Sequence, residues 1–240
     1  MEGAQAVREA LVFGTVHELF VTPMAADRNR DLVEAAASAD VKVSRITDRA
    51  ADGLSVTVTP QGIVAVCDQV DIPLADALSG RSRLVAVLVG VADPGNAGTV
   101  TRVADAAGAG AVIFAGDTVD PHNGKCVRAS TGSLFHLPVT RSRDIDQALA
   151  VCRSAGLRLV AADGNADDEL DSADLTLPTA WVFGSEAHGL PEEVRTIVDQ
   201  TLRVPIYGRA ESLNLATAAA VCLYASATAQ RHPTSPSGGT

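Results

Sequence analysis

The chain has 240 residues, of which 47% are hydrophobic and 20% are charged, and its formal net charge is −10. This composition is typical of a globular protein with a sizeable core, in one large domain or two small ones. No apolar run reaches the ~20 residues needed to cross a bilayer, and the N-terminus lacks the pattern of a secretory signal. The acidic balance argues against a protein that binds nucleic acid through an overall basic surface.

The cysteines lie far apart in the sequence, at Cys67, Cys126, Cys152 and Cys222. They form no C-x-x-C pair, and no histidine stands at zinc-ligand spacing from them. We therefore expect four free thiols in a reducing compartment, and no metal site.

The first part of the chain, residues 1–70, is predicted to be a small α/β domain. Helices are expected over 5–12 and 27–39 and from the Thr47-Asp48 cap, and strands over 16–22, 41–46 and 62–67. Residues 71–82 are expected to form a linker.

The second part, residues 83–230, alternates between apolar strands and helices. Strands are expected over 84–91, 111–115, 158–162, 181–183 and 202–204. Helices are expected over 96–107, 144–155, 191–198 and 212–228, with a helix or loop over 125–134. Such alternation is typical of an α/β fold with a parallel sheet flanked by helices. The Pro-, Ser- and Gly-rich residues 231–240 are expected to be a flexible tail.

Three loops of the second part leave strands at the carboxyl edge of the expected sheet, where ligands bind in open α/β folds. In the first loop the chain turns at Pro94-Gly95, Asn96 is expected at the helix N-cap, and Arg102 lies further along the helix. A purely structural interpretation, a capped helix with a solvated arginine, also fits this spacing.

The second loop, residues 183–191, places Ser185 and Glu186 between two glycines. Gly184 is expected to let a ligand approach the backbone closely, although a glycine-rich turn alone would explain the pattern. Ser185 and His188 do not form the G-x-S-x-G turn of a hydrolase.

The third loop, residues 204–214, turns at Pro205 and Gly208. Ser212 or Asn214 is expected to cap the following helix, and capping alone would account for both. A dinucleotide site is not indicated, because the glycines at 108 and 110 precede a strand instead of following one.

Together these loops resemble the three ordered motifs of the SpoU (TrmH-like) RNA 2'-O-ribose methyltransferases of the SPOUT superfamily. The resemblance lies in residues 94–102 (PGNAGTVTR), 183–190 (FGSEAHGL), and 206–208 (IYG) with 212–215 (SLNL), supported by 120–133. It extends over residues 84–229. Residues 1–70 are similar to the small ribosomal-protein-like RNA-recognition domain of many members. Relatives usually carry a basic segment before this point, so truncation of this chain at its N-terminus stays an open alternative.

The resemblance implies a parallel α/β domain with a C-terminal trefoil knot, which forms homodimers and binds S-adenosylmethionine in the knotted loops. Methyl transfer from this cofactor needs no metal. The implied cofactor-binding residues are Phe183, Gly184, Ser185, Gly189, Ile206, Ser212 and Leu215. The implied catalytic residues are Arg102, Asn96, Glu186, Ser212 and Asn214.

Arg102 is expected to reach toward cofactor held by the other subunit and to position the target ribose. Whether it also accepts the hydroxyl proton stays open, since arginine rarely deprotonates. Arg102, Lys125 and Arg128 are the implied RNA-binding residues, because phosphate contacts depend on local patches and not on net charge.

The resemblance therefore predicts a cytoplasmic, S-adenosylmethionine-dependent 2'-O-methyltransferase that acts on RNA, with 23S ribosomal RNA favoured and no membrane partner. Methylation of tRNA and a non-catalytic role in RNA binding or ribosome assembly remain alternatives, and a nucleotide-dependent oxidoreductase is a more distant one.

Overall fold

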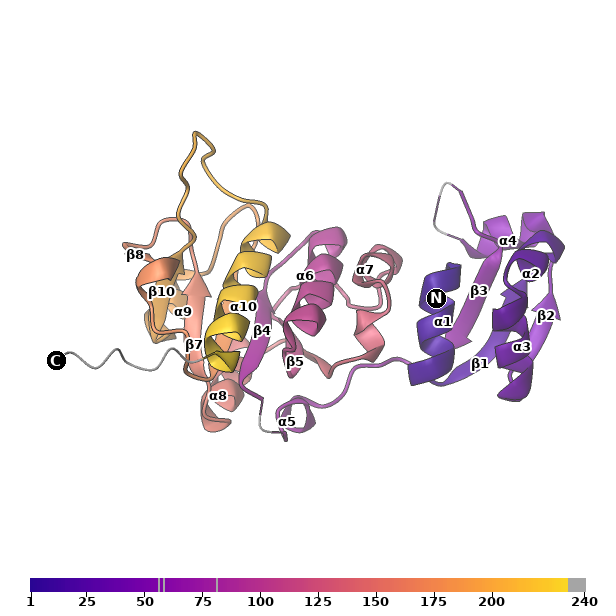
Figure 1. The fold of residues 1–240 in the computed structure, drawn as a ribbon, viewed down its shortest axis with the longest axis horizontal. Coiled ribbons are helices and arrows are strands. Elements are labelled where there is room, and N and C mark those ends of the chain that lie inside the picture. The colour runs from indigo at the N-terminus through magenta and orange to yellow at the C-terminus, as the bar shows by residue number, and fades with distance from the viewer. Residues whose placement is uncertain (56, 58, 81, 233–240) are drawn as a thin grey trace.

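The computed structural model describes residues 1–55, 57, 59–80 and 82–232, which form two α/β units, each with its own sheet (Figure 1). Only residues 231 and 232 of the expected tail belong to the described part, and the last helix ends at Arg231. No helix among the described residues is long and apolar enough to cross a membrane.

The first unit contains, in its described residues, a sheet of order β2-β1-β3 in which β1 is parallel to β2 and antiparallel to β3. Its strands are β1 (Val16–Val21), β2 (Lys42–Arg45) and β3 (Ile63–Cys67). Its helices are α1 (Ala4–Phe13), α2 (Pro23–Arg28), α3 (Arg30–Ser38) and α4 (Asp48–Leu54). Its core is built around Val7, Leu19, Leu32 and Ile63.

The second unit is a parallel sheet, with the order β6-β5-β4-β9-β7-β10-β8 in the described chain. Its strands are β4 (Leu84–Val89), β5 (Ala111–Ala115), β6 (Val139–Ser142), β7 (Arg158–Ala162), β8 (Asp168–Glu169), β9 (Thr179–Phe183) and β10 (Gln200–Arg203). Every residue of β4, β5 and β9 is buried, as expected for strands covered on both faces. The predicted parallel sheet is confirmed.

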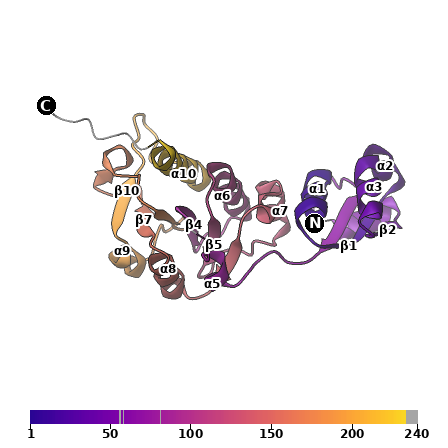
Figure 2. The same cartoon turned by 60° about the horizontal axis from the view of Figure 1, so that its bottom comes forward.

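Helices cover both faces of this sheet, as Figure 2 shows. One face carries α6 (Pro94–Ala107), α7 (Gly124–Ser130), the 3-10 turn η1 (Ser133–Phe135) and α10 (Leu215–Arg231). The other carries α5 (Leu74–Ala77), α8 (Ile145–Ser154) and α9 (Glu192–Ile197). A further 3-10 turn, η2 (Leu170–Ser172), follows β8. A buried hydrogen bond from Trp181 Nε1 to Ser226 Oγ, 2.9 Å long, ties β9 to α10.

Some elements differ from the prediction. The single helix expected over 27–39 is wrong, because the chain forms α2 and α3 with a break at Asn29, whose side-chain amide bonds to Ala25 O. The expected linker 71–82 contains α5, and Asp71 forms a parallel β-bridge with Val139, the first residue of β6. The C-terminal trefoil knot stays a prediction.

The four thiols are free, as predicted. Cys126, Cys152 and Cys222 are buried, and burial raises the pKa of each to about 12. Cys67 is only half-buried. In the described residues, no group of three or more His, Cys, Asp or Glu side chains is placed to hold a metal ion.

Candidate functional site: three loops at the carboxyl edge

The loops after β4, β9 and β10 meet at the carboxyl edge of the large sheet, around a cleft with a volume of about 890 Å³. Its walls include Asn96 from the first loop, residues 183–186 and 189 from the second, and residues 204–207 and 210–215 from the third. This size suits a ligand of cofactor dimensions. The three loops singled out in the sequence therefore contribute to one site.

The first turn of α6 is organised by Asp93. Asp93 is the N-cap, and its Oδ1 accepts a hydrogen bond from Asn96 N at 2.8 Å. The prediction of Asn96 as the cap was wrong, because Pro94 already begins the helix and suits its first position. Asn96 thus lies inside the helix, which leaves its side-chain amide for the other loops.

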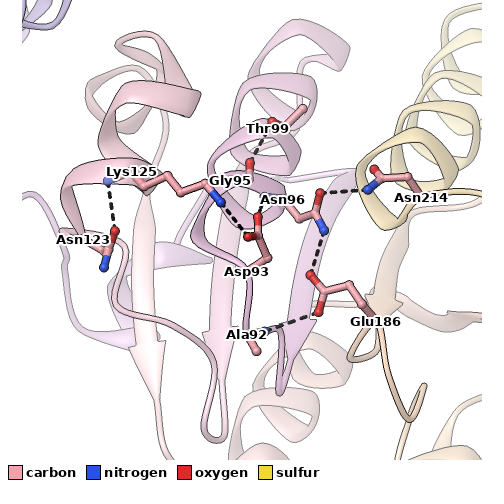
Figure 3. A network of polar contacts seen from close by, with 9 residues as sticks. All are labelled: Ala92, Asp93, Gly95, Asn96, Thr99, Asn123, Lys125, Glu186 and Asn214. Atoms are coloured by element: carbon pink, nitrogen blue, oxygen red, sulfur yellow. Dashed lines mark hydrogen bonds and ion pairs between the residues drawn. The ribbon is translucent and has the colours of Figure 1, made fainter. Parts of the chain in front are cut away.

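A polar network joins the three loops through this amide (Figure 3). Asn96 Nδ2 donates to Glu186 Oε1 at 2.8 Å, and Asn214 Nδ2 donates to Asn96 Oδ1 at 3.0 Å. The second carboxylate oxygen of Glu186 accepts from Ala92 N at 3.4 Å. Donor and acceptor of Asn96 are both used, so its orientation is fixed from two sides.

Asn214 also begins the last helix. Its Oδ1 accepts hydrogen bonds from Ala216 N at 2.9 Å and Thr217 N at 3.4 Å, which makes it the N-cap of α10. Ser212 precedes the helix and lines the cleft. One asparagine therefore caps a long helix with its oxygen and holds Asn96 with its nitrogen.

The second loop closes on itself. Ser185 and Gly189 exchange two backbone hydrogen bonds, of 3.0 and 2.8 Å. A Cβ on Gly184 would lie 2.3 Å from Gly189 C, so the loop's own backbone requires glycine there. The contact within the loop thus requires glycine at 184 by itself, and close approach of a ligand to Gly184 stays a prediction. Ser185 Oγ accepts from the N–H groups of Ala187 and His188, a turn role and not a nucleophile's.

The third loop offers backbone groups to the cleft. Within the described chain, residues 205–213 make no backbone–backbone hydrogen bonds, although Ile206 and Leu215 line the cleft. Tyr207 OH donates to Asp171 Oδ2 at 3.2 Å, and this bond raises the pKa of Tyr207. The free N–H and C=O groups can pair with the hydrogen-bonding edge of a ligand.

The three predicted RNA-binding cations lie outside this cleft. Arg102 is exposed on α6, and its Nη1 donates to Thr131 Oγ1 at 3.4 Å. Lys125 Nζ contacts Asp93 Oδ2 at 2.7 Å, and this bond lowers the pKa of Asp93. Arg128 Nη1 lies 3.7 Å from Glu2 Oε2 of the first unit.

Sequence reasoning missed other residues near the site. Asp163 and Asn165, in the loop after β7, also line the cleft. Their signal was present, since a polar Asp-Gly-Asn follows an apolar strand in the same way as the other loops. Thr131 lies in the stretch 120–133 that supports the resemblance, but nothing in the sequence predicted its contact with Arg102.

Two family models match the chain. The SpoU rRNA methylase family matches residues 83–224, and the RNA 2'-O ribose methyltransferase substrate binding family matches residues 1–73. Among curated proteins, the 23S rRNA guanosine 2'-O-methyltransferase RlmP of Bacillus subtilis is 33% identical over 228 residues, which cover 93% of this chain and 86% of the relative.

Solved structures agree with these matches. An AdoMet-bound rRNA methyltransferase from Sinorhizobium meliloti has a TM-score of 0.83 and 30% identity, covering 98% of this chain and 87% of that one. The SpoU methyltransferase AviRb from Streptomyces viridochromogenes, in complex with AdoMet, has a TM-score of 0.83 and 32% identity, covering 98% and 90%. The chain belongs to the SpoU rRNA methylase family.

Proposed function

We propose that this protein is an S-adenosylmethionine-dependent methyltransferase that methylates a ribose 2'-hydroxyl of 23S ribosomal RNA. The observation that carries the proposal is the hydrogen-bonded chain Glu186–Asn96–Asn214, which unites three sequence motifs at the mouth of one cleft. The relatives support it, because RlmP is named for 2'-O-methylation of 23S rRNA and two similar structures are described with AdoMet bound.

The cleft fits the cofactor. Apolar side chains that line the cleft, among them Phe183 and Leu215, suit an adenine ring. The free backbone groups of residues 205–213 suit the polar edge of that ring. The residues proposed to bind it are Phe183, Gly184, Ser185, Gly189, Ile206, Ser212 and Leu215. The cofactor supplies the methyl group and its sulfonium leaving group.

The protein's own contribution is alignment. Glu186, Asn96 and Asn214 hold the three loops together, and Ser212 lines the cleft beside them. We propose that these four residues align a ribose oxygen with the donated methyl group. We propose that Arg102 binds the target ribose and its adjacent phosphate and stabilises the developing alkoxide, which suits a planar, permanently charged donor.

Arg102 does not line the cleft of its own chain among the described residues, which favours its action on cofactor bound by a second copy. The outer face of α10 supports a homodimer, because Val221 and Tyr224 are 39% and 48% exposed on consecutive turns of this helix. We propose that such side chains are buried against a second copy and that Arg102 acts at the partner's cleft.

The RNA itself is proposed to contact Arg102, Lys125 and Arg128, with the first unit as a recognition domain for a folded loop. Ribosomal RNA as substrate implies a cytoplasmic protein. Because the chain as a whole is acidic, binding is expected to depend on these local contacts and to weaken as salt screens them.

The test is transfer of labelled methyl groups from S-adenosylmethionine to purified 23S rRNA and to tRNA, followed by mapping of 2'-O-methyl positions. We expect label at one ribose of 23S rRNA with the wild type and none with R102A. Cofactor binding without transfer to either RNA would favour the non-catalytic alternative.

A further inference from the structure

A short segment, residues 131–136, lies between α6, the helix that carries Arg102, and the first unit. Thr131 ends α7 in a left-handed conformation with φ 52°, and η1 then leads to His136. Elements α6 and α1 both contact η1, and Figures 1 and 2 show α1 facing α7 across the boundary of the two units. The segment thus touches both halves of the proposed enzyme.

His136 is hydrogen-bonded on both ring nitrogens. Nδ1 lies 2.8 Å from Asp105 Oδ2 on α6, and Nε2 lies 3.1 Å from Glu9 Oε2 on α1. The ring of Phe13, also on α1, meets the imidazole edge to face at 4.8 Å between centroids. Because both partners are carboxylates, the imidazolium form satisfies both with its two N–H donors.

This cluster is close to the proposed catalytic arginine. Asp105 follows Arg102 by three residues on α6, so the two side chains emerge on neighbouring turns of one side of the helix. Arg102 itself donates to Thr131 at the start of the segment. The fit to α1 is tight, because a Cβ on Gly132 would lie 2.1 Å from Glu9 Cγ.

We infer that His136 is a positioning residue that fixes the first unit against the helix carrying Arg102, and so sets where bound RNA presents its ribose. The inference rests on the proposed function only for its consequence in catalysis. The contact between the two units stands on the geometry alone.

The imidazole titrates in this environment. The hydrogen bond to Asp105, followed by the one to Glu9, raises the pKa of His136. A raised pKa in the folded state means that the charged contact stabilises docking below the ordinary histidine pKa, and that this stability is lost as pH rises through the raised value. Above it, the neutral ring keeps a single N–H, so one of the two carboxylates loses the hydrogen bond that His136 donated to it.

No other described cation takes this place. The cations of α7 point elsewhere, since Lys125 pairs with Asp93 and Arg128 lies beside Glu2. The charge of His136 is therefore the one that joins these two carboxylates within the described residues.

The test compares H136A and H136K in the full chain, with H17A as control. His17 pairs with Asp68 at 2.7 Å inside the first unit and bridges no boundary. Solution X-ray scattering between about pH 5.5 and pH 9 reports docking, because histidine charge changes within this range. The wild type should expand as pH rises, H136A should be expanded throughout, and H136K should stay compact because lysine remains charged.

Kinetics give the second readout. H136A should raise the KM for RNA roughly tenfold, equivalent to ~1.4 kcal/mol. The kcat and the KM for S-adenosylmethionine should not change. H136K should return the KM for RNA to the wild-type value. Scattering and RNA KM both unchanged in folded H136A would overturn the inference. Scattering that responds as expected in a chain that methylates no RNA would uphold the docking role and defeat the proposed function instead.

Discussion

Glu186 accepts a hydrogen bond from Asn96 at 2.8 Å, although 90 residues separate them in the chain. The bond joins the loop after β9 to the first turn of α6. Asn214, at the end of the loop before α10, donates a hydrogen bond to the side-chain amide of the same Asn96. Asn96 is thus the central residue of the site, and its loss should separate all three loops.

The polarity of this bond can be reversed. N96D replaces the donor with a carboxylate that faces Glu186, and the resulting repulsion should lower kcat by roughly 100-fold, the scale of a misplaced reacting group. The double variant N96D/E186Q restores a donor and an acceptor and should recover much of the rate. T99A, on the same helix, is the control, because Thr99 Oγ1 donates to Gly95 O within that helix and, among the described residues, joins no other loop. A double variant no better than N96D would argue against the network.

Substitution by alanine should have different effects at two glycines that line the cleft, Gly184 and Gly164. G184A forces a Cβ to within 2.3 Å of Gly189 C, whereas a Cβ on Gly164 has no heavy atom within 4 Å. We expect G184A to cost about 1–3 kcal/mol of stability and to weaken S-adenosylmethionine binding, and G164A to resemble the wild type. Thermal unfolding and calorimetric titration check both. Equal affinities in the two variants would contradict the proposed cofactor loop.

Complementation tests whether Arg102 acts across a dimer. Neither R102A nor G184A should methylate RNA well alone. In a mixed dimer, one site combines intact Arg102 from the G184A subunit with an intact cleft from the R102A subunit. Activity should therefore reappear when the two are refolded together, as methyl incorporation would show. Persistent inactivity of verified mixed dimers would mean that Arg102 serves its own subunit.

The thiols provide a test of the core. Because burial raises the pKa of Cys126, Cys152 and Cys222 to about 12, these thiols are neutral and inaccessible at neutral pH. Mass spectrometry after alkylation of the native protein should find modification at Cys67 alone. Rapid modification of a second cysteine would show that the packing around α7, α8 or α10 opens readily.

Much of the second unit was predictable because its central strands are buried on both faces. Continuous apolar runs at β4, β5 and β7 predicted strands close to those observed, and their shared direction placed the three motif loops at one edge. The short strand β8 has two residues and no apolar run, so periodicity could not indicate it.

Side-chain roles were less predictable than positions. The sequence suggested Asn96 as the N-cap, but Asp93, which precedes Pro94, is the N-cap of α6. The side chain of Asn96 therefore bonds to Glu186 instead. His136 went unnoticed because its partners lie 31 and 127 residues away, a distance no local pattern reports. The Asp105 contact arises from packing within the second unit, and the Glu9 contact arises from packing between the two units.

The most direct measurement is a crystal structure of the protein with S-adenosylmethionine. We expect the adenosine to lie against residues 205–215 and the donated methyl group to lie beside Asn96 and Glu186. An Arg102 side chain should lie within reach of the methyl carbon in the assembled protein. A donor bound outside this cleft, or Arg102 of every subunit far from the methyl group, would contradict this expectation.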